Sequence, residues 1–170
     1  IDIWYVEKEG REWSDPINAG TTINSDKNEY YISFTQTGTL YFASNVGTTE
    51  ENRHDFNIYA STLVNGEFQK PRKLGDAINT PGYEADVFVA YDESYLIFCA
   101  EREGGYGRGD LYISFKNEEG MWTKAKNMGN AINTENYEFC PFVTKDGKYF
   151  FYSGNKDIYW VDAKIIDALR

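Results

Sequence analysis

A repeat of 54–55 residues organises this chain and restricts its fold more than any other feature. Three segments align with one another, residues 2–45, 57–101 and 110–155, and a fourth copy begins with the segment 157–163. The same residue types recur at matched positions in the three complete copies: Asn24, Asn79 and Asn133, then Glu29, Glu84 and Glu138. A period of this length indicates a single array of stacked structural units, residues 1–170, rather than several unrelated domains.

Each copy divides into four short β segments. In the third copy they are DLYISFKN, MWTKAKNMG, YEFCPFVTK and KYFFYSGN, separated by turns rich in Asn, Asp and Gly. The chain is 17% aromatic, and aromatic residues favour strands. Four strands per repeat predict an all-β fold, a β-propeller built from four-stranded antiparallel blades. Only the tail DAKIIDALR shows a helical pattern, which predicts about two helical turns.

The motifs DIYWVDA, NMGNAINT and KDGKYFFYS resemble the TolB-type, WD40-like propeller repeat of exported bacterial proteins, and particularly propellers of Bacteroidetes-type bacteria. The copies depart from this pattern at two turns, QTG and YDES, and at Ala125, which replaces Pro16 and Pro71. The resemblance extends over essentially the whole chain. It implies an exported protein, periplasmic or at the cell surface, and implies no single activity.

The family pattern also orders the strands. YEFCPFVTK is then innermost, KYFFYSGN second, DIYWVDA third, and the W-x-x-P segment outermost. The chain therefore contains the outer half of one blade, two complete blades and three strands of another, about three blades of an incomplete ring. Propellers typically close with four to eight blades.

Three arrangements satisfy the unpaired edges. We favour the C-terminal half of a six-bladed protein whose other half is absent or separate. Two copies forming one ring is the second, and an open stack is the third, disfavoured because free strand edges promote aggregation. The first residues, IDIWYVEKEG, show neither an initiator Met nor a leader pattern, which indicates a removed leader or a piece of a longer chain. All three arrangements predict association through open blade edges.

The composition excludes several classes of partner and site. A net charge of −10 disfavours nucleic acid and anionic membrane surfaces. No apolar run is long enough to span a membrane. The two cysteines, Cys99 and Cys140, lie in apolar runs away from any histidine, so we expect small buried side chains and no zinc site. We expect no cofactor, although a bound cation fits the acidic chain.

The repeated Glu29, Glu84 and Glu138 stand where each innermost strand begins, near the expected channel mouth. One interpretation is a ring of carboxylates that binds a ligand or cation, or acts as acid and base. The other is that each Glu satisfies backbone N–H groups in the loop entering its own blade. We favour this structural role, because identity in every copy usually reports the repeat unit itself.

Asp86 breaks the repeat, because its equivalents are Tyr31 and Cys140. A position where the copies differ is a better candidate for function. Strand alternation in EADVFVA places Glu84, Asp86 and Phe88 on one side, so Asp86 is expected to face the channel near Glu84. Two alternatives stay open, a ligand- or cation-binding acid pair and a pair that is merely solvated.

The segment EREGGYGRGD joins two strands through a Gly-rich turn. It lacks the Lys-Ser/Thr and the following helix of a phosphate-binding loop, so it is interpreted as a turn. Arg102 and Arg108 are kept as candidate contacts for an anionic ligand.

These observations favour a non-catalytic binding or protein-interaction propeller module, with a carbohydrate, a peptide or another protein as ligand. No catalytic residue is assigned. The alternative is a hydrolase or lactonase-type propeller with a carboxylate or metal site at the channel mouth. Because propellers support many chemistries, the choice depends on the site.

Overall fold

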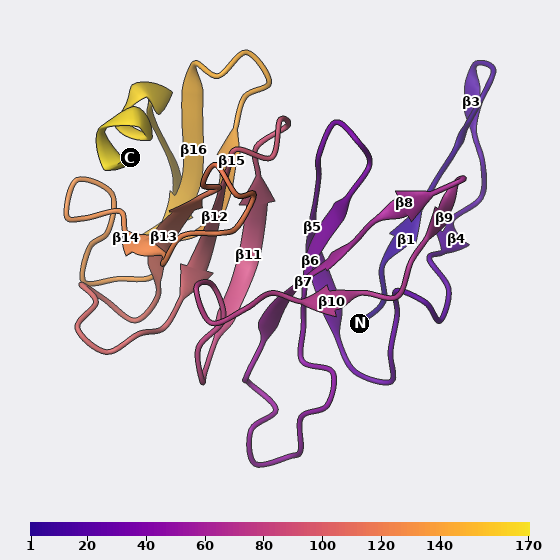
Figure 1. Ribbon diagram of the computed structural model, residues 1–170, viewed down its shortest axis with the longest axis horizontal. Helices are drawn as coiled ribbons and strands as arrows, with labels where there is room; N and C mark the ends of the chain where they lie inside the picture. Colours follow the sequence, from indigo (N-terminus) through magenta and orange to yellow (C-terminus); the bar gives the residue numbers. More distant parts are fainter.

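A computed structural model describes residues 1–170, and it is built almost entirely from antiparallel strands (Figure 1). Two sheets have four strands each. The first runs in the order β10 (Arg72–Lys73), β7 (Asn57–Ser61), β6 (Leu40–Ser44) and β5 (Glu29–Phe34). The second runs β11 (Glu84–Val89), β12 (Tyr95–Ala100), β13 (Asp110–Phe115) and β14 (Lys126–Asn127).

Two further sheets are incomplete. At the C-terminal end, β15 (Phe139–Val143), β16 (Tyr149–Gly154) and β17 (Asp157–Asp162) form three strands with no fourth. At the N-terminal end, β1 (Trp4–Tyr5) pairs with β4 (Ile17–Asn18), which correspond to the third and fourth strands of a blade. Hairpins β2–β3 (Lys8–Glu9, Glu12–Trp13) and β8–β9 (Leu63–Val64, Glu67–Phe68) extend the first two copies. This strand order confirms the predicted fold, an incomplete propeller.

The sheets pack face to face, and the cores lie between neighbouring sheets. Buried side chains of β7, β11 and β12, including Ile58, Val87 and Phe98, form one cluster. Side chains of β12, β13 and β16, including Leu111 and Phe150, form the next. The C-terminal tail adds Ala163 and Ile166 to this second cluster through two short 3₁₀ helices, η1 (Ala163–Ile165) and η2 (Asp167–Leu169), instead of the regular helical turns expected.

The repeated asparagine ties the loop between blades to the preceding sheet. Asn79 Oδ1 accepts from Ile58 N (2.8 Å), and Asn79 Nδ2 donates to Ile58 O (3.0 Å) and to Leu74 O (2.8 Å). The paired contacts with one backbone residue recur at Asn24 with Ile3 and at Asn133 with Leu111, at the same distances. The amide therefore hydrogen-bonds the third strand much as a backbone residue of a neighbouring strand would.

The repeated glutamate fastens the other end of the same loop. Glu138 accepts from the backbone N of Thr134 (2.9 Å) and from its hydroxyl (2.6 Å). Glu29 makes the equivalent contacts with Ser25, at 3.0 Å and 2.6 Å, and accepts also from the Ser44 hydroxyl at 2.8 Å. Both carboxylates are buried. These contacts favour the structural role for the glutamates.

Replacing Asn79 with Ala will lower the free energy of unfolding by about 3 kcal/mol, because the buried backbone groups of Ile58 lose their partners. Urea unfolding monitored by tryptophan fluorescence measures this change. The exposed Asn136 in the next loop provides the control, and Asn136→Ala is expected to change stability by less than about 0.5 kcal/mol. Equal effects of both substitutions would contradict this role of Asn79.

Candidate functional site

The three inner strands share one local irregularity, and it determines what faces the axis of the array. Pairing of β5 with β6, β11 with β12 and β15 with β16 shifts register at the same point of each strand. The bulged residues are Tyr31, Asp86 and Cys140, and all three have left-handed backbone, with φ of 50°, 52° and 51°. A β-bulge leaves one residue outside the regular pairing and redirects its side chain.

The bulges bring these three side chains together, although they come from three different sheets. The Tyr31 hydroxyl contacts Cys140 Sγ in hydrogen-bonding geometry across 109 residues of sequence. Asp86 lies on the strand between them and is only 3% exposed. Asp86 Oδ1 has no hydrogen-bond partner. A buried carboxylate oxygen without a donor is costly, so this atom indicates a place for a ligand group.

The surroundings of Asp86 are neutral. Burial raises the pKa of Asp86 to about 7, an effect that the backbone N–H of Cys140 partly offsets. Burial likewise raises the pKa of Tyr31 and of Cys140, and the charge of Asp86 adds to both shifts. Close to neutral pH, Asp86 is therefore balanced between a neutral carboxyl group and an unpaired carboxylate.

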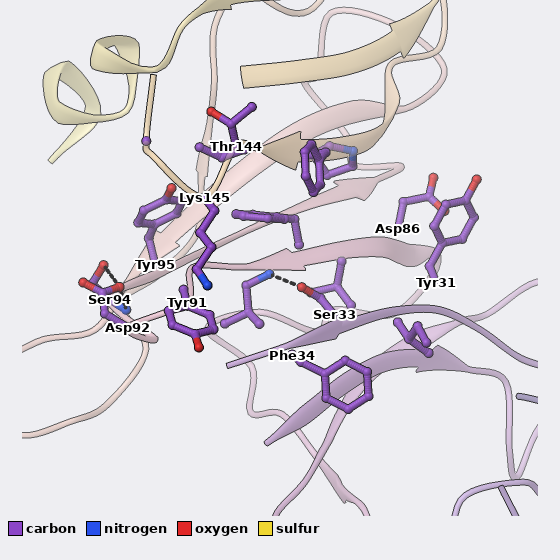
Figure 2. A pocket seen from close by; sticks show the side chains of 18 of the residues that line it. Tyr31, Ser33, Phe34, Asp86, Tyr91, Asp92, Ser94, Tyr95, Thr144 and Lys145 are labelled. Atoms are coloured by element: carbon purple, nitrogen blue, oxygen red, sulfur yellow. Dashed lines mark hydrogen bonds between the residues drawn. The ribbon is translucent and has the colours of Figure 1, made fainter. Parts of the chain in front are cut away.

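A cavity of about 860 Å³ opens along the inner strands, and Asp86 forms part of its wall. Figure 2 shows Asp86 and Tyr31 together at one end, with Lys145 beside Tyr91 at the other. Lys145 Nζ lies 4.9 Å from the centre of the Tyr91 ring. The wall between the two ends is largely apolar and includes Phe34, Val87, Phe88, Pro141 and Phe142. The cavity thus combines aromatic surface with two carboxyl groups, Asp86 and Asp92, and two cationic groups, Lys145 and Arg170.

The expected pairing of Glu84 with Asp86 is wrong. The bulge after Ala85 interrupts strand alternation, so Asp86 lines the cavity whereas Glu84 remains buried at the loop. Glu84 Oε1 accepts from the Thr80 hydroxyl at 2.5 Å, and Glu84 Oε2 has no hydrogen-bond partner. Burial raises the pKa of Glu84.

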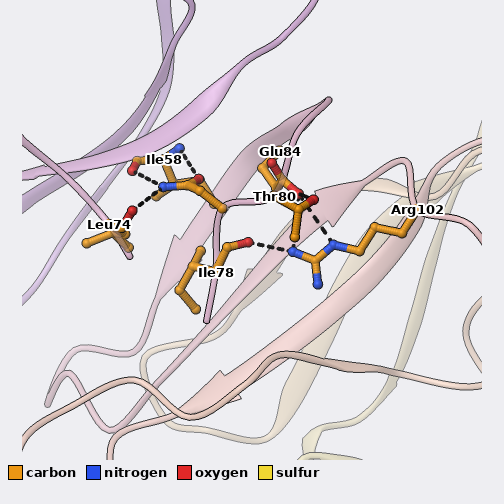
Figure 3. Close-up of polar contacts among 7 residues, drawn as sticks. Ile58, Leu74, Ile78, Thr80, Glu84 and Arg102 are labelled. Carbon is orange, nitrogen blue, oxygen red and sulfur yellow. Dashed lines mark hydrogen bonds and ion pairs between the residues drawn. The ribbon is translucent and has the colours of Figure 1, made fainter. Parts of the chain in front are cut away.

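Arg102 lies beside Glu84, as Figure 3 shows. Its guanidinium forms an ion pair with Glu84 (3.2 Å) and donates to the carbonyl of Ile78. It also covers the rings of Tyr112 and Phe98, at 4.6 Å and 5.3 Å from their centres. These contacts orient Arg102 for a structural role in the second copy.

The other predicted candidates lie apart from the cavity. Arg108 is exposed in the Gly-rich turn, where its backbone N donates to Asn136 O (2.9 Å). Glu29, the first residue of β5, and Glu138, which precedes β15, hydrogen-bond their own loops, and binding roles for these residues stay predictions. Cys99 is buried as expected, but Cys140 is only partly buried, because the bulge turns it toward the cavity.

No three His, Cys, Asp or Glu side chains are grouped so as to hold a metal ion. Among the helices, none has the length and apolar character to cross a bilayer.

Four-stranded antiparallel blades, with inner strands lining an axial cavity, define a β-propeller of the TolB-like fold. One similar structure is TolB from Acinetobacter baumannii, with a TM-score of 0.55 and 16% identity, covering 87% of this chain and 32% of that one. Another is the putative TolB from Agrobacterium tumefaciens, with a TM-score of 0.54 and 12% identity, covering 86% of this chain and 48% of that one.

The chain thus spans at most about half the length of these structures, and identities this low establish the fold alone. No protein-family model matches the sequence, and no curated protein matches it.

Sequence reasoning singled out Asp86 but missed Tyr31 and Cys140 as its neighbours. The signal was available, because these residues occupy the same repeat position, and equivalent positions of inner strands converge at the axis of a propeller. The contribution of Lys145 and of the aromatic wall had no comparable signal in the repeat.

The raised pKa of Asp86 predicts a stability that falls as pH rises. The folded state holds a proton on Asp86 up to about pH 7, while the unfolded chain releases it near pH 3.8. Stability is therefore lost between these values, by roughly 2–3 kcal/mol from pH 5 to pH 8. Urea unfolding across this range measures the slope, and Asp86→Asn is expected to reduce it by that amount.

Asp92 provides the matched control, since it lines the same cavity but hydrogen bonding to Ser94 lowers its pKa. Asp92→Asn should leave the loss of stability between pH 5 and pH 8 in place. An unchanged pH dependence in Asp86→Asn would contradict a raised pKa at Asp86.

Proposed function

We propose that this chain is a non-catalytic binding module of an exported bacterial protein, and that its axial cavity binds a basic side chain of a protein partner. The observation that carries this proposal is Asp86, a buried carboxyl group with an unpartnered oxygen in the wall of a large aromatic cavity. A Lys or Arg side chain would supply the missing donor and the opposite charge.

The rest of the cavity supports the same class of ligand. Lys and Arg have long aliphatic stems, which pack on apolar walls such as Phe88 and Phe142. Aromatic rings also attract cations placed over their faces. At the opposite end, Lys145 would interact with carbonyl or carboxylate oxygens of a peptide. The net charge of −10 favours encounter with a basic partner.

The exported location rests on the resemblance of the repeat motifs, and association through the open edges at β1 and β17 belongs to the same proposal.

The hydrolase or lactonase alternative required two carboxylates converging at the channel mouth. Glu29 and Glu84 begin β5 and β11, Glu138 precedes β15, and all three hydrogen-bond the loops between blades, whereas Asp86 lines the cavity. The second acid of the cavity, Asp92, lies beside Tyr91 at the end away from Asp86 (Figure 2). The binding module is therefore preferred.

Titration with the capped peptide acetyl-Gly-Lys-Gly-amide, followed by ¹H–¹⁵N NMR, tests the proposal. At pH 8 we expect shifts at Asp86, Phe88 and Phe142, and about tenfold weaker binding to Asp86→Asn, which loses the charge-assisted hydrogen bond. Binding should weaken at pH 5.5, because Asp86 is then protonated.

Two controls make the result specific. The peptide acetyl-Gly-Gln-Gly-amide keeps a similar length without the charge, and Asp92→Asn removes another acid of the same cavity. Equal binding of the Lys and Gln peptides would contradict recognition of a cation. Binding of a neutral maltohexaose that Asp86→Asn leaves unchanged would favour the carbohydrate alternative.

A further inference from the structure

One position of the repeat, at the start of the third strand, is buried in three copies and exposed to solvent in the fourth. The first apolar residue of the third strand is Ile3, Ile58, Leu111 and Ile158 in successive copies. Its exposure is 9%, 0% and 0% in the first three, but 70% in Ile158. The same sequence position therefore has two different environments within one chain.

The difference is caused by the outer strand, its loop and the sheet that follows. Ile58 packs in one cluster with side chains of β11 and β12 and with Leu74 and Ile78, and Leu111 packs in another with side chains of β15 and β16 and with Met128 and Ile132. Leu74, Ile78, Met128 and Ile132 belong to the motif [LM]-G-x-x-I-N, whose asparagine pairs with the backbone of the covered residue. β17 forms the edge of its sheet and has no outer strand.

The N-terminal sheet shows that inner strands of the same sheet are not required for this burial. β1 has no inner neighbours, yet Ile3 is buried because Ile23 of the Asn24 loop and Leu40 and Phe42 of the next sheet pack against it. Conversely, β17 has both inner neighbours and Ile158 is exposed, as is Trp160 at 60%. The missing contacts at Ile158 are thus the outer strand, the loop that follows it and the next sheet.

We propose that the free edge of β17 binds an extended strand of a separate partner polypeptide carrying the motif [LM]-G-x-x-I-N. The partner strand pairs antiparallel with β17, as β14 pairs with β13. Its asparagine hydrogen-bonds the backbone of Ile158, and its two apolar residues cover the Ile158 side chain. This inference rests on the edge association proposed above and adds the identity of the occupant.

A second copy of this chain is a poor source of such a strand. Its own outer strands β4, β10 and β14 are already paired with β1, β7 and β13. The tail is also engaged, because Ile166 is buried in the neighbouring core and Lys126 Nζ donates to Leu169 O (2.9 Å). Because these segments already have their own contacts, a separate polypeptide is the favoured source of the strand.

A peptide with the sequence of residues 121–134 provides the probe, because it contains the complete outer strand and loop of the third copy. Fluorescence anisotropy of the labelled peptide measures binding to the 170-residue chain. Hydrogen exchange of the Ile158 and Trp160 amides locates it. We expect saturable binding, slower exchange at these amides, and about tenfold weaker binding when the asparagine of the peptide is replaced by alanine.

Variants of the chain complete the test. Ile158→Asp is expected to weaken binding at least tenfold, while Val64→Asp, on the exposed hairpin strand β8, leaves it unchanged. No binding, or binding that Ile158→Asp does not affect, would overturn the proposal. Light scattering measures the oligomeric state as a further test. A dimer that Ile158→Asp abolishes would identify a second copy as the occupant, and this result would also overturn the proposed separate partner.

The proposal for the axial cavity and the proposal for the edge of β17 can be rejected independently of each other. Ile158 does not line the axial cavity, so Ile158→Asp is expected to leave titration with the Lys peptide unchanged. Loss of peptide binding at the edge together with intact Lys binding would reject only the proposed strand partner.

Discussion

The arrangement of the blades depends on one side-chain amide per repeat. Asn24, Asn79 and Asn133 each make two hydrogen bonds to one backbone residue of the preceding third strand. Five residues later, a buried glutamate fastens the same loop where the next inner strand begins. Because this loop connects the outer strand of one sheet to the inner strand of the next, both contacts constrain how neighbouring sheets are placed.

This constraint separates the scaffold from the site. The residues that hold the blades together are the same in every copy, and they lie in the loops between blades or where an inner strand begins. The residues at the inner bulges are Tyr31, Asp86 and Cys140, which share a backbone conformation but no side-chain chemistry. A bulge keeps its shape when its side chain changes, so the axial surface can vary while the blade remains intact. For this reason the positions where the copies disagree carry the candidate function.

Much of the fold could be predicted from the sequence because the repeat fixes the number of strands and the resemblance of its motifs to TolB-type repeats orders them, and the open blades at both ends followed from these two. The arrangement of the site residues was harder to predict from the sequence. Strand alternation misplaced Asp86 relative to Glu84, because a bulge has no reliable signal in a single strand. The contact between Tyr31 and Cys140 joins two sheets and depends on the angle between blades. Arg102 looked available for a ligand until its neighbours Glu84, Tyr112 and Phe98 were placed.

The two open edges of the array are not equivalent, and the difference follows from which strands are missing. At β1 the outer strand, the Asn24 loop and the next sheet are present, so Ile3 is buried even though β1 has no inner neighbours. At β17 the inner strands are present, but Ile158 and Trp160 are exposed. An exposed apolar edge would ordinarily pair with any strand, and flanking charges are one means of restricting such pairing. At this edge Asp157 and Asp162 stand beside Lys156 and Lys164, so charges of both signs flank β17, and the choice of a partner strand depends on how well that strand covers Ile158.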